Sequence, residues 1–196
     1  MVRLLYIDCC IRRELSRTRI LAEAVLAALQ AKGAYQVERL CLMDEPLMPL
    51  SEGFFDQRES LLAEHDYLHP RFRYAHQFSQ ADRVIVAAPF WDLSFPALLR
   101  LYIENISVEG ITFGVDERGP HGLCRAERLL FLTTRGGDYR HSRLEMGARY
   151  LEALCEFWGI PRFDVVAADG LDLGREEVKT ILDRAIEEAL TSVEDF

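Results

Sequence analysis

Two hydroxyl side chains stand where the chain changes from a strand pattern to a helix pattern. Residues 8–19 read DCCIRRELSRTR and follow the apolar run VRLLYI. Ser16 and Thr18 therefore lie at the expected start of a helix, where free backbone N–H groups and the helix dipole favour an anion. The segment lacks the glycines and the lysine of a P-loop, so it suits a terminal phosphate monoester better than a triphosphate. A simpler interpretation is that Ser16 or Thr18 only caps the helix.

A second candidate segment, residues 89–96, reads PFWDLSFP and follows the apolar run RVIVAA. It holds three aromatic residues, Phe90, Trp91 and Phe95, at a point where the chain is expected to be exposed. Exposed aromatic side chains are unfavourable unless they cover a flat apolar group or a partner chain. The alternative is that they pack beneath a neighbouring hairpin.

A third segment, TRGG at residues 134–137, follows the apolar run RLLFLT. Two glycines allow the backbone to approach a ligand closely, and neighbouring N–H groups can bond the polar edge of a ring. A tight turn would need the same residues. Taken together, the three segments predict a site for a flat ring that carries a phosphate tail, and FMN fits that description.

The elements that must position these segments alternate between strand and helix. Near-continuous apolar or alternating runs predict five strands, at 2–7, 35–42, 83–88, 128–133 and 162–168. Helical periodicity predicts helices from Ser16 to about residue 33 and at about 72–81, 95–107, 143–158 and 175–193. This alternation indicates an α/β protein with three layers, a parallel sheet covered by helices on both faces. Five strands favour the flavodoxin-like order 2-1-3-4-5, in which a ligand binds between strands 1 and 3, beyond their carboxyl ends.

Two segments interrupt the alternation. Residues 46–71 form a long connection with a short helix expected near 57–66, and residues 108–125 are expected to form a hairpin. We see no linker or repeat, and a length of 196 residues is typical of one domain, which we expect to span 1–196.

Composition narrows the class of protein further. A net charge of −9 argues against nucleic acid or an anionic membrane as a partner. No apolar run is long enough to cross a bilayer and no signal-peptide pattern is present, so a cytoplasmic protein is expected. Five cysteines without a C-x-x-C pair are expected to be small buried apolar residues in a reducing compartment, and no metal site is expected.

One stretch of the chain resembles a known protein family. The segment PFWDLSFPALLRLYIENISVEGITFGVDERGPHGL, followed by TTRGG, resembles the FMN-dependent NADH-azoreductases, a branch of the flavodoxin-like quinone reductases. That family has a P-M-Y-N-F type loop, G-V-T-F and N-G-P-x-G-L segments, and an S-R-G-G loop. The resemblance covers essentially the whole chain and is strongest over 84–137.

The resemblance implies a set of FMN contacts but no catalytic side chain, because the flavin carries out the hydride transfer. The phosphate would lie among Cys10, Ser16, Arg17 and Thr18. Ring and ribityl contacts would come from Phe90, Trp91, Asp92 and Leu93, and pyrimidine-edge contacts from Thr134, Arg135, Gly136 and Gly137. Independently of the resemblance, the place of Tyr139 just beyond the two glycines predicts that it supports the flavin or the substrate from a second layer. NADH or NADPH would reduce FMN, and a quinone, azo compound or similar flat acceptor would then enter the same pocket of a homodimer whose flavin lies near the interface.

Three positions depart from the family pattern. Cys10 replaces a serine, and its thiol is a poor hydrogen-bond donor. Asp92 replaces an asparagine, which would place a carboxylate near the flavin, and Val115 stands where family members can carry an aromatic residue. These departures concern substrate choice and reduction potential more than FMN binding.

Two other functional classes remain open at this point. One is a non-enzymatic electron carrier of flavodoxin type, which the acidic surface would suit. The other is a regulator that binds flavin or another ligand without turnover. The segments 46–71 and 108–125 favour the enzyme, because they would cover the flavin rather than expose it.

Overall fold

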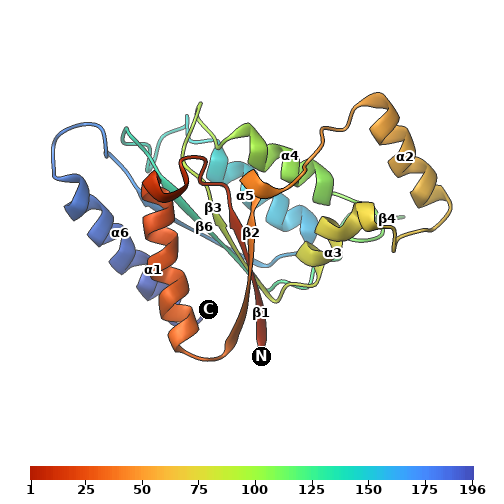
Figure 1. Cartoon of the computed structure of the whole chain (residues 1–196), viewed down its shortest axis with the longest axis horizontal. Helices are drawn as coiled ribbons and strands as arrows, with labels where there is room; N and C mark the ends of the chain where they lie inside the picture. Colours follow the sequence, from red (N-terminus) through yellow and green to blue (C-terminus); the bar gives the residue numbers. More distant parts are fainter.

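Five parallel strands form the central sheet of the computed structural model, which describes residues 1–196 (Figure 1). Their bounds lie within one residue of the predicted ones: β1 Val2–Asp8, β2 Tyr35–Cys41, β3 Arg83–Ala87, β6 Arg128–Thr134 and β7 Arg162–Ala168. Their order across the sheet is β2-β1-β3-β6-β7. These numbers differ from the expected 2-1-3-4-5 because a separate antiparallel hairpin, β4 (Phe113–Asp116) and β5 (Gly119–Gly122), precedes the fourth parallel strand in the chain.

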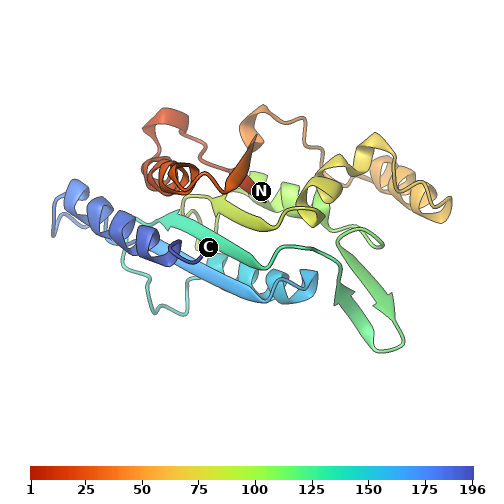
Figure 2. The same ribbon diagram turned by 90° about the horizontal axis from the view of Figure 1, so that it is seen from below.

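The helices cover both faces of the sheet. One face carries α1 (Arg17–Ala31) and α6 (Val178–Ser192), and the other carries α3 (Arg73–Ser79), α4 (Ala97–Ile106) and α5 (Gly147–Trp158) (Figures 1 and 2). Alternate residues of β1 point to opposite layers, as a strand requires. Leu4 and Tyr6 belong to the core beneath α1 and α6, whereas Leu5 and Ile7 belong to the core beneath the other three helices. The apolar runs that predicted the strands are therefore explained by burial on two faces.

The two interrupting segments lie away from the middle of the sheet. Helix α2 (Glu52–Ala63) begins earlier than the expected residue 57, projects from the body and has no buried residue (Figure 1). The β4–β5 hairpin also projects (Figure 2). Short 3-10 turns occur at Arg13–Leu15, Leu42–Asp44 and Pro70–Phe72. No helix has both the length and the apolar character that crossing a membrane requires.

The cysteines only partly follow the expectation from composition. Cys9, Cys10 and Cys155 are buried, and burial raises the pKa of the Cys9 thiol to about 12. Cys41 and Cys124 are only partly buried, which corrects the expectation that all five would be core residues. All five are free thiols.

Arg128, the first residue of β6, is the main buried charge at the amino-terminal edge of the sheet. It is 4% exposed, and its guanidinium group donates to Asp164 Oδ2 at 2.5 Å, Asp195 Oδ1 at 2.7 Å and the Ser192 carbonyl at 2.8 Å. These bonds compensate for the loss of hydration and fasten the end of α6 to the sheet.

We predict that Arg128→Ala lowers the free energy of unfolding by about 2–3 kcal/mol, because it removes several charge-assisted hydrogen bonds and leaves the Asp164 carboxylate without its partner. Arg162→Ala is the matched control. Arg162 contacts the same Asp195 at 3.2 Å, but both side chains are exposed, so a loss below about 1 kcal/mol is expected. Urea denaturation measures both. Equal losses in the two variants would contradict the role assigned to Arg128.

Candidate functional site

The loops that follow the parallel strands meet at the carboxyl edge of the sheet around a cavity of about 240 Å³. Seven of its lining residues are among those expected from the sequence: Ser16, Arg17, Phe90, Trp91, Thr134, Arg135 and Gly136. The sequence reasoning missed five others: Arg12, Leu15, Pro89, Leu171 and Asp172. The cavity lies where the connection direction changes between β1 and β3, the place where open α/β sheets bind ligands.

The start of α1 forms one end of the cavity. Ser16 is the N-cap residue, and its hydroxyl accepts weakly from the Arg19 N–H at 3.4 Å. Thr18 is fully buried, and its hydroxyl lies 2.7 Å from that of Thr134. The Thr18 side chain therefore joins the start of α1 to the end of β6 and does not line the cavity, although Ser16 does.

Cys10 is also placed behind the cavity wall. Its N–H donates to Asp8 Oδ1 at 2.8 Å, and its sulfur faces the Ala87 carbonyl at 3.7 Å. Burial is the main reason that the pKa of its thiol lies far above the ordinary value, so the thiol stays protonated. Cys10 supports the shape of the loop after β1.

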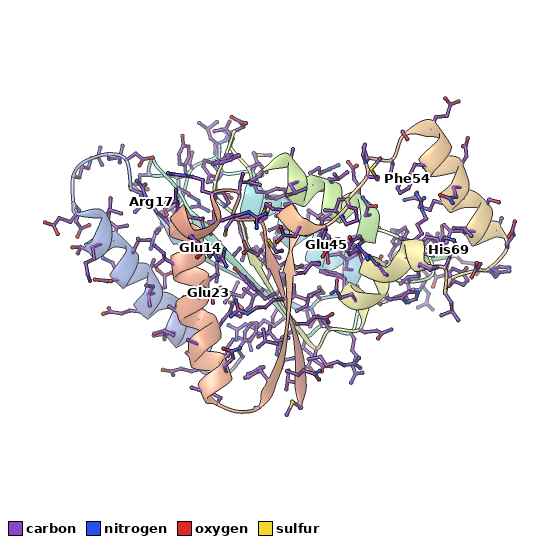
Figure 3. All side chains as sticks on the ribbon, viewed as in Figure 1. Glu14, Arg17, Glu23, Glu45, Phe54 and His69 are labelled. Carbon is purple, nitrogen blue, oxygen red and sulfur yellow. The ribbon has the colours of Figure 1, made fainter.

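Two arginines stand at the same end. Arg17, at the amino-terminal end of α1 (Figure 3), bonds Asp172 Oδ1 through Nη1 at 2.7 Å, which closes the mouth between α1 and the loop after β7. Asp172 lies so close to Gly136 that a Cβ there would come within 2.4 Å of its Oδ2 atom. Arg12 lines the cavity but forms no ion pair, unlike its neighbour Arg13, which pairs with Asp44 at 2.6 Å.

The loop after β3 contributes a tight turn at residues 91–94. Trp91 and Ser94 exchange backbone hydrogen bonds of 3.1 and 2.8 Å. The two central residues, Asp92 and Leu93, have φ values of 48° and 67°, a conformation that usually selects Asn-Gly. Trp91 is 42% exposed and lines the cavity, whereas Asp92 and Leu93 are exposed beyond it. Phe95 is buried in the core rather than exposed.

Arg135 lies at the other end of the cavity and is only 3% exposed. Its guanidinium group is 3.3 Å from Glu145 Oε1 and 3.3 Å from Asp169 Oδ1, and 5.5 Å from the centre of the Phe90 ring. Phe90 in turn packs on Tyr139, with 4.6 Å between ring centres. Neither Gly137 nor Tyr139 lines the cavity directly. Val115 lies on the projecting hairpin, 56% exposed, and does not line the cavity in a single chain.

A family model described as flavodoxin-like fold matches residues 2–193. A relative from Caldicellulosiruptor saccharolyticus, named FMN-dependent NADH:quinone oxidoreductase, is 34% identical over 194 residues, which is 96% of each chain. The chain therefore belongs to the family that this model describes, the family of flavodoxin-like fold.

Other relatives agree with the assignment. FMN-dependent NADH:quinone oxidoreductase 2 from Clostridium acetobutylicum is 43% identical over 131 residues, and the match spans 65% of this chain and 66% of that one, just under two thirds. The azoreductase from Bacillus anthracis str. Sterne has a TM-score of 0.89 at 26% identity over 100% of both chains. An FMN-dependent NADH-azoreductase from Bacillus anthracis str. Ames Ancestor, solved in complex with FMN, shares the fold, with a TM-score of 0.83 at 20% identity over 98% of this chain and 97% of that one.

The buried hydroxyl pair of Thr18 and Thr134 generates a stability prediction. Thr18→Val should lower the free energy of unfolding by about 1–2 kcal/mol, because it leaves the Thr134 hydroxyl without its partner. Thr18→Val combined with Thr134→Val should cost less than the sum of the single changes, because no polar atom is then left unpaired. Urea denaturation of the three variants tests this. Strictly additive losses would show that the two hydroxyls do not interact.

Proposed function

We propose that this chain is an FMN-dependent NAD(P)H oxidoreductase that passes electrons from NAD(P)H to a quinone, an azo compound or a similar flat acceptor. The observation that carries the proposal is the cavity at the carboxyl edge of the sheet, with a helix start and two arginines at one end and a glycine-containing loop at the other. The names of the relatives support the same chemistry. We further propose that residues 1–196 act as a single FMN-binding domain in the cytoplasm.

The residues around the cavity fit FMN by their chemistry. A dianionic phosphate would be held by the free N–H groups of Arg17 and Thr18 at the start of α1 and by the Ser16 hydroxyl, with the guanidinium group of Arg12 as an added positive charge. Cys10 would act indirectly by shaping the loop. Gly136 would let the backbone meet the ligand, since even a Cβ there would collide with Asp172.

The aromatic side chains would position the ring. Trp91 and Phe90 would supply apolar contact beside it, and the backbone of Thr134 to Gly137 would meet its polar edge. Tyr139 would pack against the Phe90 ring and hold it in place. The turn at Asp92 and Leu93 would fix the position of the Trp91 side chain in the cavity wall.

FMN, when bound, would supply the hydride-accepting centre of the reaction. The part played by the chain is to orient that centre and to exclude water from it. No side chain in the cavity needs to move a proton. Because the cavity is small, the electron donor and the acceptor would have to occupy the same space in turn, which corresponds to a ping-pong sequence.

Steady-state turnover tests the proposal directly. We expect NADH oxidation to require both added FMN and a quinone or azo acceptor. If FMN binds but NADH is not oxidised, the chain is a flavodoxin-type electron carrier or a regulator instead. If FMN does not bind at all, the cofactor assignment is wrong.

Arg12 gives a sharper test of the phosphate end. We predict that Arg12→Gln weakens FMN about tenfold, since one charge-assisted hydrogen bond contributes about 1.5–3 kcal/mol and this one is partly screened. Riboflavin, which lacks the phosphate, should bind the variant and the wild type equally. Arg13→Gln is the matched control, because Arg13 is already paired with Asp44 and does not line the cavity. Equal weakening of FMN and riboflavin by Arg12→Gln would place the phosphate elsewhere. Fluorescence titration measures the affinities of the wild type and both variants for FMN and for riboflavin.

We also propose that the chain works as a homodimer. One chain encloses about 240 Å³, below the roughly 300–1,000 Å³ typical of ligand sites, so part of the ligand would remain uncovered. Exposed apolar side chains surround the mouth of the cavity, among them Leu15, Trp91 and Leu93. We predict that sedimentation at micromolar concentration gives twice the mass of one chain. A monomer that retains FMN and full turnover would contradict this.

A further inference from the structure

The turn at residues 91–94 holds two adjacent non-glycine residues at positive φ, Asp92 at 48° and Leu93 at 67°. For an L-residue this conformation is unfavourable, somewhat less so for aspartate. Such a conformation persists only where the surroundings impose it. The turn borders the cavity through Trp91, so whatever holds the turn also holds one cavity wall.

The contact that holds the turn comes from the start of α5. The Met146 N–H donates to the Leu93 carbonyl at 2.9 Å. The next residue, Gly147, brings the two segments into direct contact, because a Cβ there would lie 3.4 Å from the carbonyl carbon of Ser94 and 3.4 Å from the Phe95 ring. A backbone hydrogen bond from Met146, in a closely packed segment, therefore holds the strained residue Leu93 in place.

Glu145 fixes the residue that makes this bond. It immediately precedes Met146, is 6% exposed, and its carboxylate accepts from the Ala148 N–H with both oxygens, at 3.0 and 3.1 Å. The same carboxylate lies 3.3 Å from Arg135 Nη2, and Arg135 is anchored in turn by Asp169. Residues 145–148 therefore have little freedom to shift.

We propose that Glu145 is a positioning residue that holds the Trp91–Ser94 turn in its strained form and so sets the position of the Trp91 wall. It acts through the Met146 N–H and does not itself line the cavity. The cavity whose wall it sets is the FMN site of the proposed function, and this part of the inference rests on that proposal. Sequence gives no sign of such a role, because Glu145 belongs to no motif.

A role as an ordinary helix cap is the competing explanation. A cap would stabilise α5 alone, whereas a positioning residue must also protect the turn. Hydrogen exchange of the ligand-free protein separates the two, because the Trp91 and Ser94 N–H groups bond each other's carbonyls within the turn.

In Glu145→Ala we expect the amides of Trp91, Ser94 and Met146 to exchange at least tenfold faster than in the wild type. Glu152→Ala, on the exposed side of the same helix, should leave all three unchanged. Faster exchange confined to α5 would overturn the proposal. Should Glu145→Ala fail to fold, Glu145→Gln keeps the volume and the cap but loses the charge pairing with Arg135, and it should change the same three amides in the same direction.

Leu93→Gly supplies a second, independent arm. Glycine adopts positive φ without strain, so the turn should no longer depend on its external hold. We expect Glu145→Ala combined with Leu93→Gly to recover protection of Trp91 and Ser94 to within about threefold of Leu93→Gly alone. No recovery would mean that Glu145 does not act by opposing the strain at Leu93.

The final arm measures the consequence for the ligand. Glu145→Ala should weaken FMN binding about tenfold, and Leu93→Gly should restore most of that loss. If the wild type binds no FMN, the proposed function fails, while the two exchange experiments still decide whether Glu145 holds the turn. If FMN binds the wild type and Glu145→Ala equally, the link between the turn and the cavity is wrong.

Discussion

The buried guanidinium group of Arg135 is the interaction on which the arrangement of the site depends. Removing a full charge from water costs several kcal/mol, so the group is stable only where carboxylates reach it. Here they come from two different loops, Glu145 before α5 and Asp169 after β7, each at 3.3 Å. The Phe90 ring of a third loop lies 5.5 Å away. A single charge thus ties together the segments that follow β3, β6 and β7.

The two ends of the cavity differ in how firmly they are built. The end near Arg135 holds buried carboxylates, packed aromatic rings and a backbone in a strained turn. The end near α1 offers N–H groups and exposed arginines, one of which is engaged by Asp172. Rigid apolar walls suit the placement of a flat ring, whereas exposed cations suit a charged tail that must exchange with solvent. This division fits a ligand that is flat at one end and dianionic at the other.

Much of this arrangement can be predicted from the sequence, because strand positions depend on local apolar patterns. All five parallel strands lie within one residue of their predicted bounds, and the three loops after β1, β3 and β6 do line the cavity. Side-chain direction was harder to predict. Thr18 points into the structure toward the Thr134 hydroxyl, and Cys10 points toward the Ala87 carbonyl, and neither contact can be read from a sequence pattern. No sequence pattern indicated Asp172, Glu145 and Arg12, because loops without periodicity bring them to the site. Helix α5 begins at 147 rather than 143, and the carboxylate of Glu145, just before it, accepts from the Ala148 N–H in its first turn.

Anaerobic reduction of the FMN-loaded protein tests the central claim most directly. One equivalent of NADH or NADPH is mixed with the holoprotein in the absence of oxygen, and the visible absorbance of the flavin is followed. An enzyme of the proposed kind loses that absorbance in a single fast phase and regains it when a quinone is added. Absorbance that persists, in a protein that retains its FMN, would show that the cavity binds the flavin without accepting electrons from the nicotinamide.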